Sequence, residues 1–142
     1  QKKLLTQEQL EKALEAQKIT KDFLGALLVR YRLISEEDLL KVLSEQFNIP
    51  AMQLQWQAID WQLAMRYTPS VVVDHMILPV QQKGQTITVA LVNPLDAEGM
   101  SRIEDQSKGF MVIPVLVTMS EMKRALKTFN EHMALKIKKM LE

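Results

Sequence analysis

The sequence contains no cysteine, only four glycines and no long apolar run, and each absence excludes a class of function. Without cysteine there is neither a disulfide framework nor a thiol nucleophile, and a reducing cytosol is compatible with the chain. The glycines are scattered, at positions 25, 84, 99 and 109, so they form no phosphate-binding loop. No apolar run reaches membrane-spanning length, so any work at a membrane is expected to be that of a peripheral partner.

Charge and titratable residues give no sign of a catalytic centre. Eighteen basic and seventeen acidic side chains leave a net charge of +1, which provides no global basic field for nucleic acid. His75 and His132 stand apart in sequence, whereas a metal site needs clustered ligands. Acidic residues at 36–38, 96 and 98 fall where helices are expected to begin, and the helix dipole explains them. We therefore expect no catalytic residue, no metal and no obligatory cofactor.

A short internal repeat organises the first fifty residues. Residues 5–17 (LTQEQLEKALEAQ) align with residues 34–46 (ISEEDLLKVLSEQ), and a helix is expected over residues 21–31 before the second copy. The first copy has almost nothing upstream, so we expect the chain to begin inside a repeat, as a fragment would. Asn48-Ile49-Pro50 ends the last of these helices. The pattern predicts a helical subdomain over residues 1–50.

The remainder, residues 51–142, is expected to be a small α+β subdomain with roughly three strands packed against helices. Residues 76–81 and 86–92 flank a glycine-containing turn and predict a hairpin. The run 110–117 is apolar on both faces and predicts a central strand, although Pro114 within it implies an edge position or a bulge. Residues 51–54 are a short candidate strand.

Helix signals fill the rest of this second part. Helices are expected after Asp60, over Pro69–His75, and from Asp96 to about Ser107. Thr118 and Glu121 form a capping box that begins one long amphipathic helix, which runs to the end as a connector.

Methionine recurs along that last helix and leaves two interpretations open. It could fill the core, or it could form an adaptable docking face. The candidate docking residues are Met122, Phe129 and Met133.

Several landmarks together resemble a known family. They are Leu24-Gly25-x-x-Leu28-Val29, Phe47-Asn48-Ile49-Pro50, His75-x-x-Leu78-Pro79-Val80 and Asn93-Pro94-Leu95-Asp96. This pattern is similar to the N-terminal domain of the ATPases of type II secretion and type IV pilus assembly. The resemblance implies a non-catalytic cytoplasmic module that docks the motor to the cytoplasmic part of an inner-membrane assembly protein. It also implies an ATPase core beyond Glu142, with the last helix as the arm toward it.

Some domains of this family bind cyclic di-GMP, and the resemblance makes nucleotide sensing the alternative function. Their motif has arginine where this chain has Phe23, and glycine where it has Arg32. Because the chain departs from the motif at these two positions, we expect the leucines and Gly25 that it retains to serve packing and not ligand binding. A third alternative is the regulatory domain of another enzyme. The candidate nucleotide-binding residues are Phe23, Leu24, Gly25, Leu28, Arg30, Arg32 and Gln46.

Overall fold

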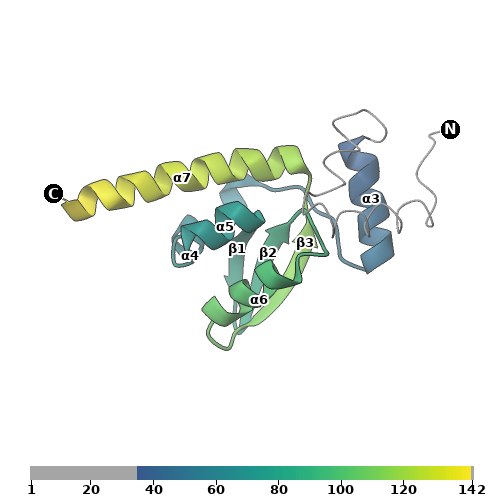
Figure 1. Cartoon of the computed structure of the whole chain (residues 1–142), viewed down its shortest axis with the longest axis horizontal. Helices are drawn as coiled ribbons and strands as arrows, with labels where there is room; N and C mark the ends of the chain where they lie inside the picture. Colours follow the sequence, from purple (N-terminus) through teal and green to yellow (C-terminus); the bar gives the residue numbers. More distant parts are fainter. Residues whose placement is uncertain (1–34, 142) are drawn as a thin grey trace.

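The computed structural model describes residues 35–141, so the helices expected before residue 35 lie outside the described part. Five α-helices, one short 3-10 helix and a three-stranded sheet make up that part (Figure 1). The α+β fold class is confirmed, whereas the division at residue 50 stays a prediction. The elements in chain order are α3 (Glu36–Phe47), the 3-10 helix (Trp56–Ala58), α4 (Trp61–Ala64), α5 (Pro69–His75), β1 (Ile77–Lys83), β2 (Thr86–Leu91), α6 (Ala97–Gln106), β3 (Met111–Leu116) and α7 (Met119–Leu141).

The sheet has the order β1-β2-β3. β1 and β2 form the predicted antiparallel hairpin, and Gly84 supplies the positive φ of +56° that its turn requires. β2 and β3 run parallel, with α6 in the connection between them. The expectation that β3 is central was wrong: β2 is central, and Pro114, which has no N–H to donate, lies in the edge strand. The candidate strand 51–54 is reduced to a single bridge from Ala51 to Leu116.

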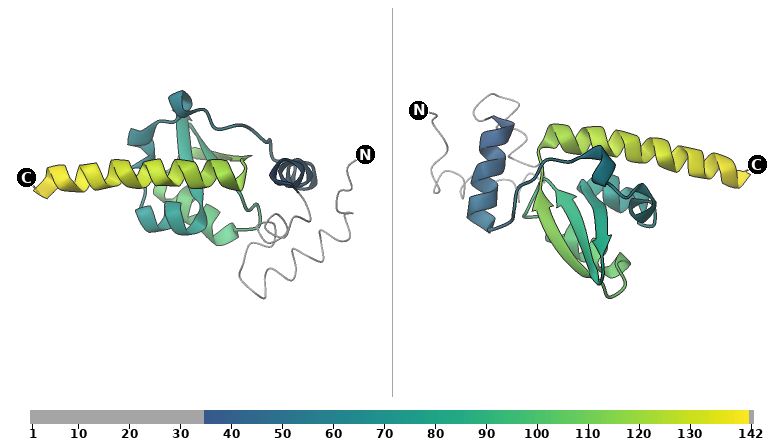
Figure 2. Two further views of the ribbon diagram at one scale, coloured as in Figure 1. Left: turned by 90° about the horizontal axis from the view of Figure 1, so that it is seen from above. Right: turned by 180° about the vertical axis from the view of Figure 1, so that it is seen from behind.

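Helices cover one face of this sheet. α5 and α6 lie over that face, and α7 runs across one end of the strands (Figures 1 and 2). The core lies between them. Its largest fully buried side chains include Phe129, Ile77, Leu78, Leu91, Ile103, Leu116 and Met122. On β3, Met111 and Ile113 remain exposed, so the end of the sheet farthest from α7 is only partly covered.

Local caps place the helices as the sequence predicts. The hydroxyl of Ser35 accepts from Asp38 N at the start of α3, and Thr118 and Glu121 make the reciprocal capping box of α7. Glu121 Oε2 also accepts from Leu54 N at 2.9 Å, which holds the segment after α3 against α7. Glu36 accepts from the backbone N–H and the hydroxyl of Ser120, so the first turns of α3 and α7 are joined.

Candidate functional site

The two family landmarks of the second part meet in space. α5 ends at His75, and Met76 then adopts the left-handed conformation that turns the chain into β1. His75 Nδ1 donates to Asp96 Oδ2 at 2.7 Å, and Asp96 Oδ1 accepts from Gly99 N at 2.9 Å as the N-cap of α6. We call this arrangement the His75–Asp96 clamp. Both carboxylate oxygens are engaged, so the clamp serves to join α5 to α6.

A buried pair of hydroxyls joins the same helices from the other end. Tyr67 Oη and Ser107 Oγ lie 2.7 Å apart, and Ser107 Oγ donates to Ile103 O at 2.7 Å. Gln106 bonds the backbone and the hydroxyl of Thr68 close by. Because Ser107 donates within its own helix and pairs with Tyr67, it is a satisfied core residue.

The proposed docking residues of α7 belong mostly to the core. Met122 and Phe129 are 0% exposed, so they cannot present a surface to a partner, and that prediction is corrected. Met133 is half-buried and packs against the same core. The methionine stripe is therefore chiefly the face that fastens α7 to α4 and α5.

Only one of the candidate nucleotide-binding residues falls within the described part of the chain. Gln46 is half-buried on α3. Phe23, Leu24, Gly25, Leu28, Arg30 and Arg32 lie outside the described residues. Two leucines of the repeat, Leu39 and Leu43, are buried at 7% and 2% exposure and help to pack α3 onto the rest of the fold.

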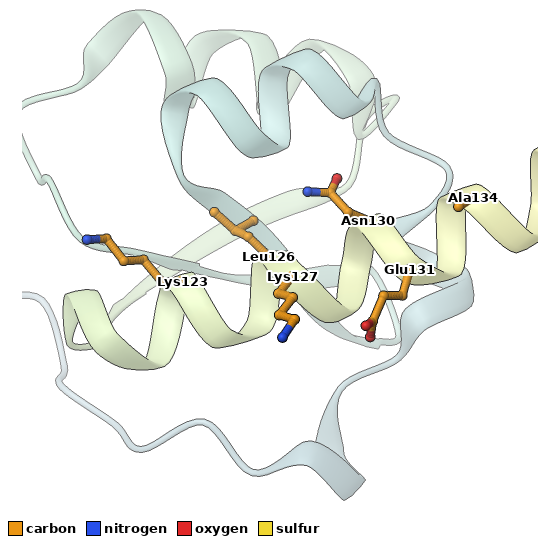
Figure 3. A pocket seen from close by; sticks show the side chains of 6 residues that line it. All are labelled: Lys123, Leu126, Lys127, Asn130, Glu131 and Ala134. Atoms are coloured by element: carbon orange, nitrogen blue, oxygen red, sulfur yellow. The ribbon is translucent and has the colours of Figure 1, made fainter.

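The outer face of α7 carries a shallow depression of about 530 Å³. All the described side chains that line it come from this one helix (Figure 3): Lys123, Leu126, Lys127, Asn130, Glu131 and Ala134. We refer to this surface as the outer face. Its lining mixes two cations with one carboxylate on a single convex helix, which limits how tightly it can hold a ligand.

A second groove, of about 620 Å³, lies between α4 and the last turns of α7. We call it the α4–α7 groove. Sequence reasoning missed it, although the basic tail after residue 135 was a signal. One wall comes from α4 and the turn after it, and the other from α7. The described residues that line it are Gln62, Met65, Arg66, His132, Leu135, Lys136, Lys139 and Met140.

One aromatic contact fixes the inner end of the α4–α7 groove. The rings of Trp61 and His132 are stacked with centroids 5.1 Å apart and planes 17° apart. This contact is a packing interaction between two ring faces. It fastens α4 to α7 beside the groove.

Two features are absent from the described part of the chain. Within residues 35–141 no three His, Asp or Glu side chains gather as a metal site would need. None of the helices in that range combines the length and the hydropathy that a bilayer span requires.

Comparison with known proteins identifies the family. The model of the MshEN domain matches residues 47–134, which is more than half of the chain. The chain belongs to the MshEN domain family. The resemblance to the N-terminal domain of secretion and pilus ATPases is thereby confirmed. Both residues of the clamp, His75 and Asp96, fall within the matched range.

Relatives of this MshEN domain include type IV pilus assembly ATPases. The type IV pilus assembly ATPase PilB of Myxococcus xanthus is 30% identical over 91 residues, which are 64% of this chain and 16% of that protein. PilB of Thermus thermophilus is 28% identical over 125 residues, which are 87% of this chain and 14% of that protein. The chain thus spans only a small part of the length of these curated relatives.

Solved structures share the fold. MshE, in a structure with cdg, superposes with a TM-score of 0.69 at 23% identity, covering 88% of this chain and 90% of that one. The N-terminal domain of XpsE superposes with a TM-score of 0.58 at 17% identity, covering 87% of this chain and 85% of that one. At these identities the likeness establishes the architecture of the MshEN domain.

Proposed function

We propose that this MshEN domain is a non-catalytic docking and regulatory module of a secretion or pilus assembly ATPase. It couples the motor, through its own ATPase core, to the cytoplasmic domain of an inner-membrane assembly protein. It acts in the cytoplasm and reaches the membrane through that partner. The observation that carries the proposal is the family match, together with relatives that are pilus ATPases of which this chain covers 14–16%.

The surfaces support a binding role. The polar groups that would be reactive elsewhere, in the His75–Asp96 clamp and the Tyr67–Ser107 pair, are used to join helices. Apart from Met52, the large apolar side chains left exposed among the described residues lie on β3 and on the last turns of α7. Exposed apolar residues grouped on a small domain favour contact with another protein.

Direct binding tests this function. The 142-residue chain is titrated against the cytoplasmic domain of the inner-membrane assembly protein from the same system, by biolayer interferometry. We expect a dissociation constant of about 1–100 μM, as small transient interfaces give. A cytoplasmic domain from an unrelated membrane protein serves as the control. Equal signals from the two domains, or none from either, would contradict the docking function.

Cyclic di-GMP sensing is the second candidate, and one observation favours it. The structure of MshE with cdg, which we interpret as cyclic di-GMP, covers 88% of this chain. This chain keeps Gly25 and Gln46 of the motif but has Phe23 and Arg32 at two of its positions. A phenylalanine cannot donate the hydrogen bonds that arginine gives to a guanine, which weakens the case.

Calorimetric titration with cyclic di-GMP separates the two functions. We expect no saturable heat, because of the residues at positions 23 and 32. Cyclic di-AMP, which has the same charge but lacks guanine, is the control ligand. Saturable micromolar binding of cyclic di-GMP alone, lost in Gly25→Ala or Arg32→Ala, would make nucleotide sensing the function of the domain.

A further inference from the structure

Charge is concentrated on α7. The helix carries six basic and two acidic side chains, a net +4, although the whole chain has only +1. Two of these basic residues, Lys136 and Lys139, line the α4–α7 groove. Arg66 lines the same groove from the α4 side. None of these three cations forms an ion pair within residues 35–141, and no described residue that lines the groove is acidic. The groove therefore favours a ligand with negative charge.

The same groove is also apolar. Met65 is half-buried on the α4 side, and Leu135 and Met140 on α7 are 59% and 76% exposed. Leaving such side chains in water is unfavourable, so a ligand that covers them gains hydrophobic energy. Methionine adapts its shape to a partner at low cost, which suits a docking surface. The ligand therefore combines apolar groups with acidic ones.

The dimensions fit an α-helix. From His132 to Met140 the α7 wall rises about 12 Å, which equals about two turns of a partner helix laid alongside. Figures 1 and 2 show the last turns of α7 projecting beyond α4. The walls form a concave surface, which holds a convex helix on two sides. A flat bilayer would touch only the rim.

We propose that the α4–α7 groove binds an acidic amphipathic helix of a partner protein. Apolar side chains of that helix pack onto Met65, Leu135 and Met140, and its carboxylates pair with Arg66, Lys136 and Lys139. This rests on the proposed docking function and assigns a surface and a partner chemistry to it. Helix-in-groove recognition of this kind reads apolar positions spaced three and four residues apart, with charges fixing the orientation.

A designed peptide tests the groove directly. The probe is a helical peptide of about 18 residues with leucine on one face and glutamate elsewhere, and its partner has lysine in place of every glutamate. Affinity for the 142-residue chain is measured by fluorescence anisotropy at low salt. We expect the glutamate peptide to bind at least about 30-fold more tightly than the lysine peptide. Raising the salt concentration should weaken the binding of the glutamate peptide, because salt screens the attraction between exposed charges.

Two triple variants with the same change of charge locate the site. In the groove variant Arg66, Lys136 and Lys139 are changed to Glu, and we expect at least about 30-fold weaker binding of the glutamate peptide. In the matched control the exposed residues Lys123, Arg124 and Lys127, in the first half of α7 and outside the groove, are changed to Glu, and we expect a loss of less than about threefold. Equal losses in both variants would overturn the proposal, because they would indicate attraction by net charge alone. Circular dichroism and thermal melting confirm that each variant is folded.

The partner domain and vesicles separate the failure of this inference from that of the docking function. If the assembly-protein domain binds wild type and the groove variant equally, the groove assignment is wrong and docking stands. If that domain binds neither, but the peptide depends on the groove, docking to it is wrong and the groove assignment stands. Groove-dependent binding to phosphatidylglycerol vesicles, with no binding of the peptide, would make the ligand a membrane and overturn the proposal.

Discussion

Replacing Phe129 by alanine is expected to lower the free energy of unfolding by about 3–5 kcal/mol. The ring is 0% exposed and lies among the residues that fasten α7 to the rest of the fold. Its removal loses the transfer free energy of a large apolar side chain and leaves a cavity that neighbouring side chains fill only in part. Urea denaturation followed by far-ultraviolet circular dichroism measures the change, provided that the dependence on urea is the same for both proteins.

Leu135→Ala on the same helix is the matched control. Leu135 is 59% exposed, so its truncation should change stability by no more than about 0.5 kcal/mol. If Phe129→Ala were as mild as this control, the ring would not be a core residue, and the docking role suggested by the sequence would have to be restored. The two variants thus decide between the alternative roles of the apolar stripe on α7.

The apolar stripe on α7 shows what periodicity can and cannot determine. Steps of three and four residues predict which side chains share a face, and Met122, Leu126 and Phe129 do share the buried face. Periodicity does not say what covers that face. The covering elements, α4 and α5, come from a much earlier part of the chain, and no local signal specifies that approach.

The order of the strands could not be predicted from the sequence for a related reason. The run 110–117 is apolar, and burial on both faces is commonest in central strands. In the structure only the last part of β3 is buried, and the strand lies at the edge beside β2. Pro114 was the better guide, because a missing N–H constrains hydrogen bonding directly, whereas composition constrains it only through packing.

Helix boundaries were predicted well because the signals are local. Pro69 begins α5, Asp96 caps α6, and the Thr118–Glu121 box begins α7, each as expected. The α4–α7 groove was missed, because it exists only where the turn after α4 meets residues of α7 that are far away in the sequence. The basic residues after position 135 indicated a binding site, but the sequence did not predict that α4 and the turn after it would form the opposite wall.

Replacing Asp96 by alanine is expected to lower the free energy of unfolding by about 2–3 kcal/mol. The loss of an N-cap costs about 1 kcal/mol, and a hydrogen bond to an ionised group contributes about 1.5 kcal/mol or more. Asp96 supplies both, since Oδ1 caps α6 and Oδ2 accepts from His75. Chemical denaturation of the single variants and of the double variant with His75→Ala measures each part.

Asp60→Ala is the matched control, because Asp60 caps α4 through Leu63 N and has no link to a second helix within the described residues. It should cost only about 1 kcal/mol. In the His75→Ala background, the loss of unfolding free energy caused by Asp96→Ala should fall to about the same value as for Asp60→Ala. A coupling energy near zero between His75 and Asp96 would contradict the clamp.

Gly99→Ala gives an independent check. A Cβ there would lie 2.6 Å from Asp96 Oδ2 and 2.8 Å from Ile77 Cδ1, and the carboxylate oxygen cannot move away without breaking its bond to His75. A methyl group at position 99 should therefore destabilise the domain as the loss of the carboxylate does, by disrupting the same junction between α5 and α6.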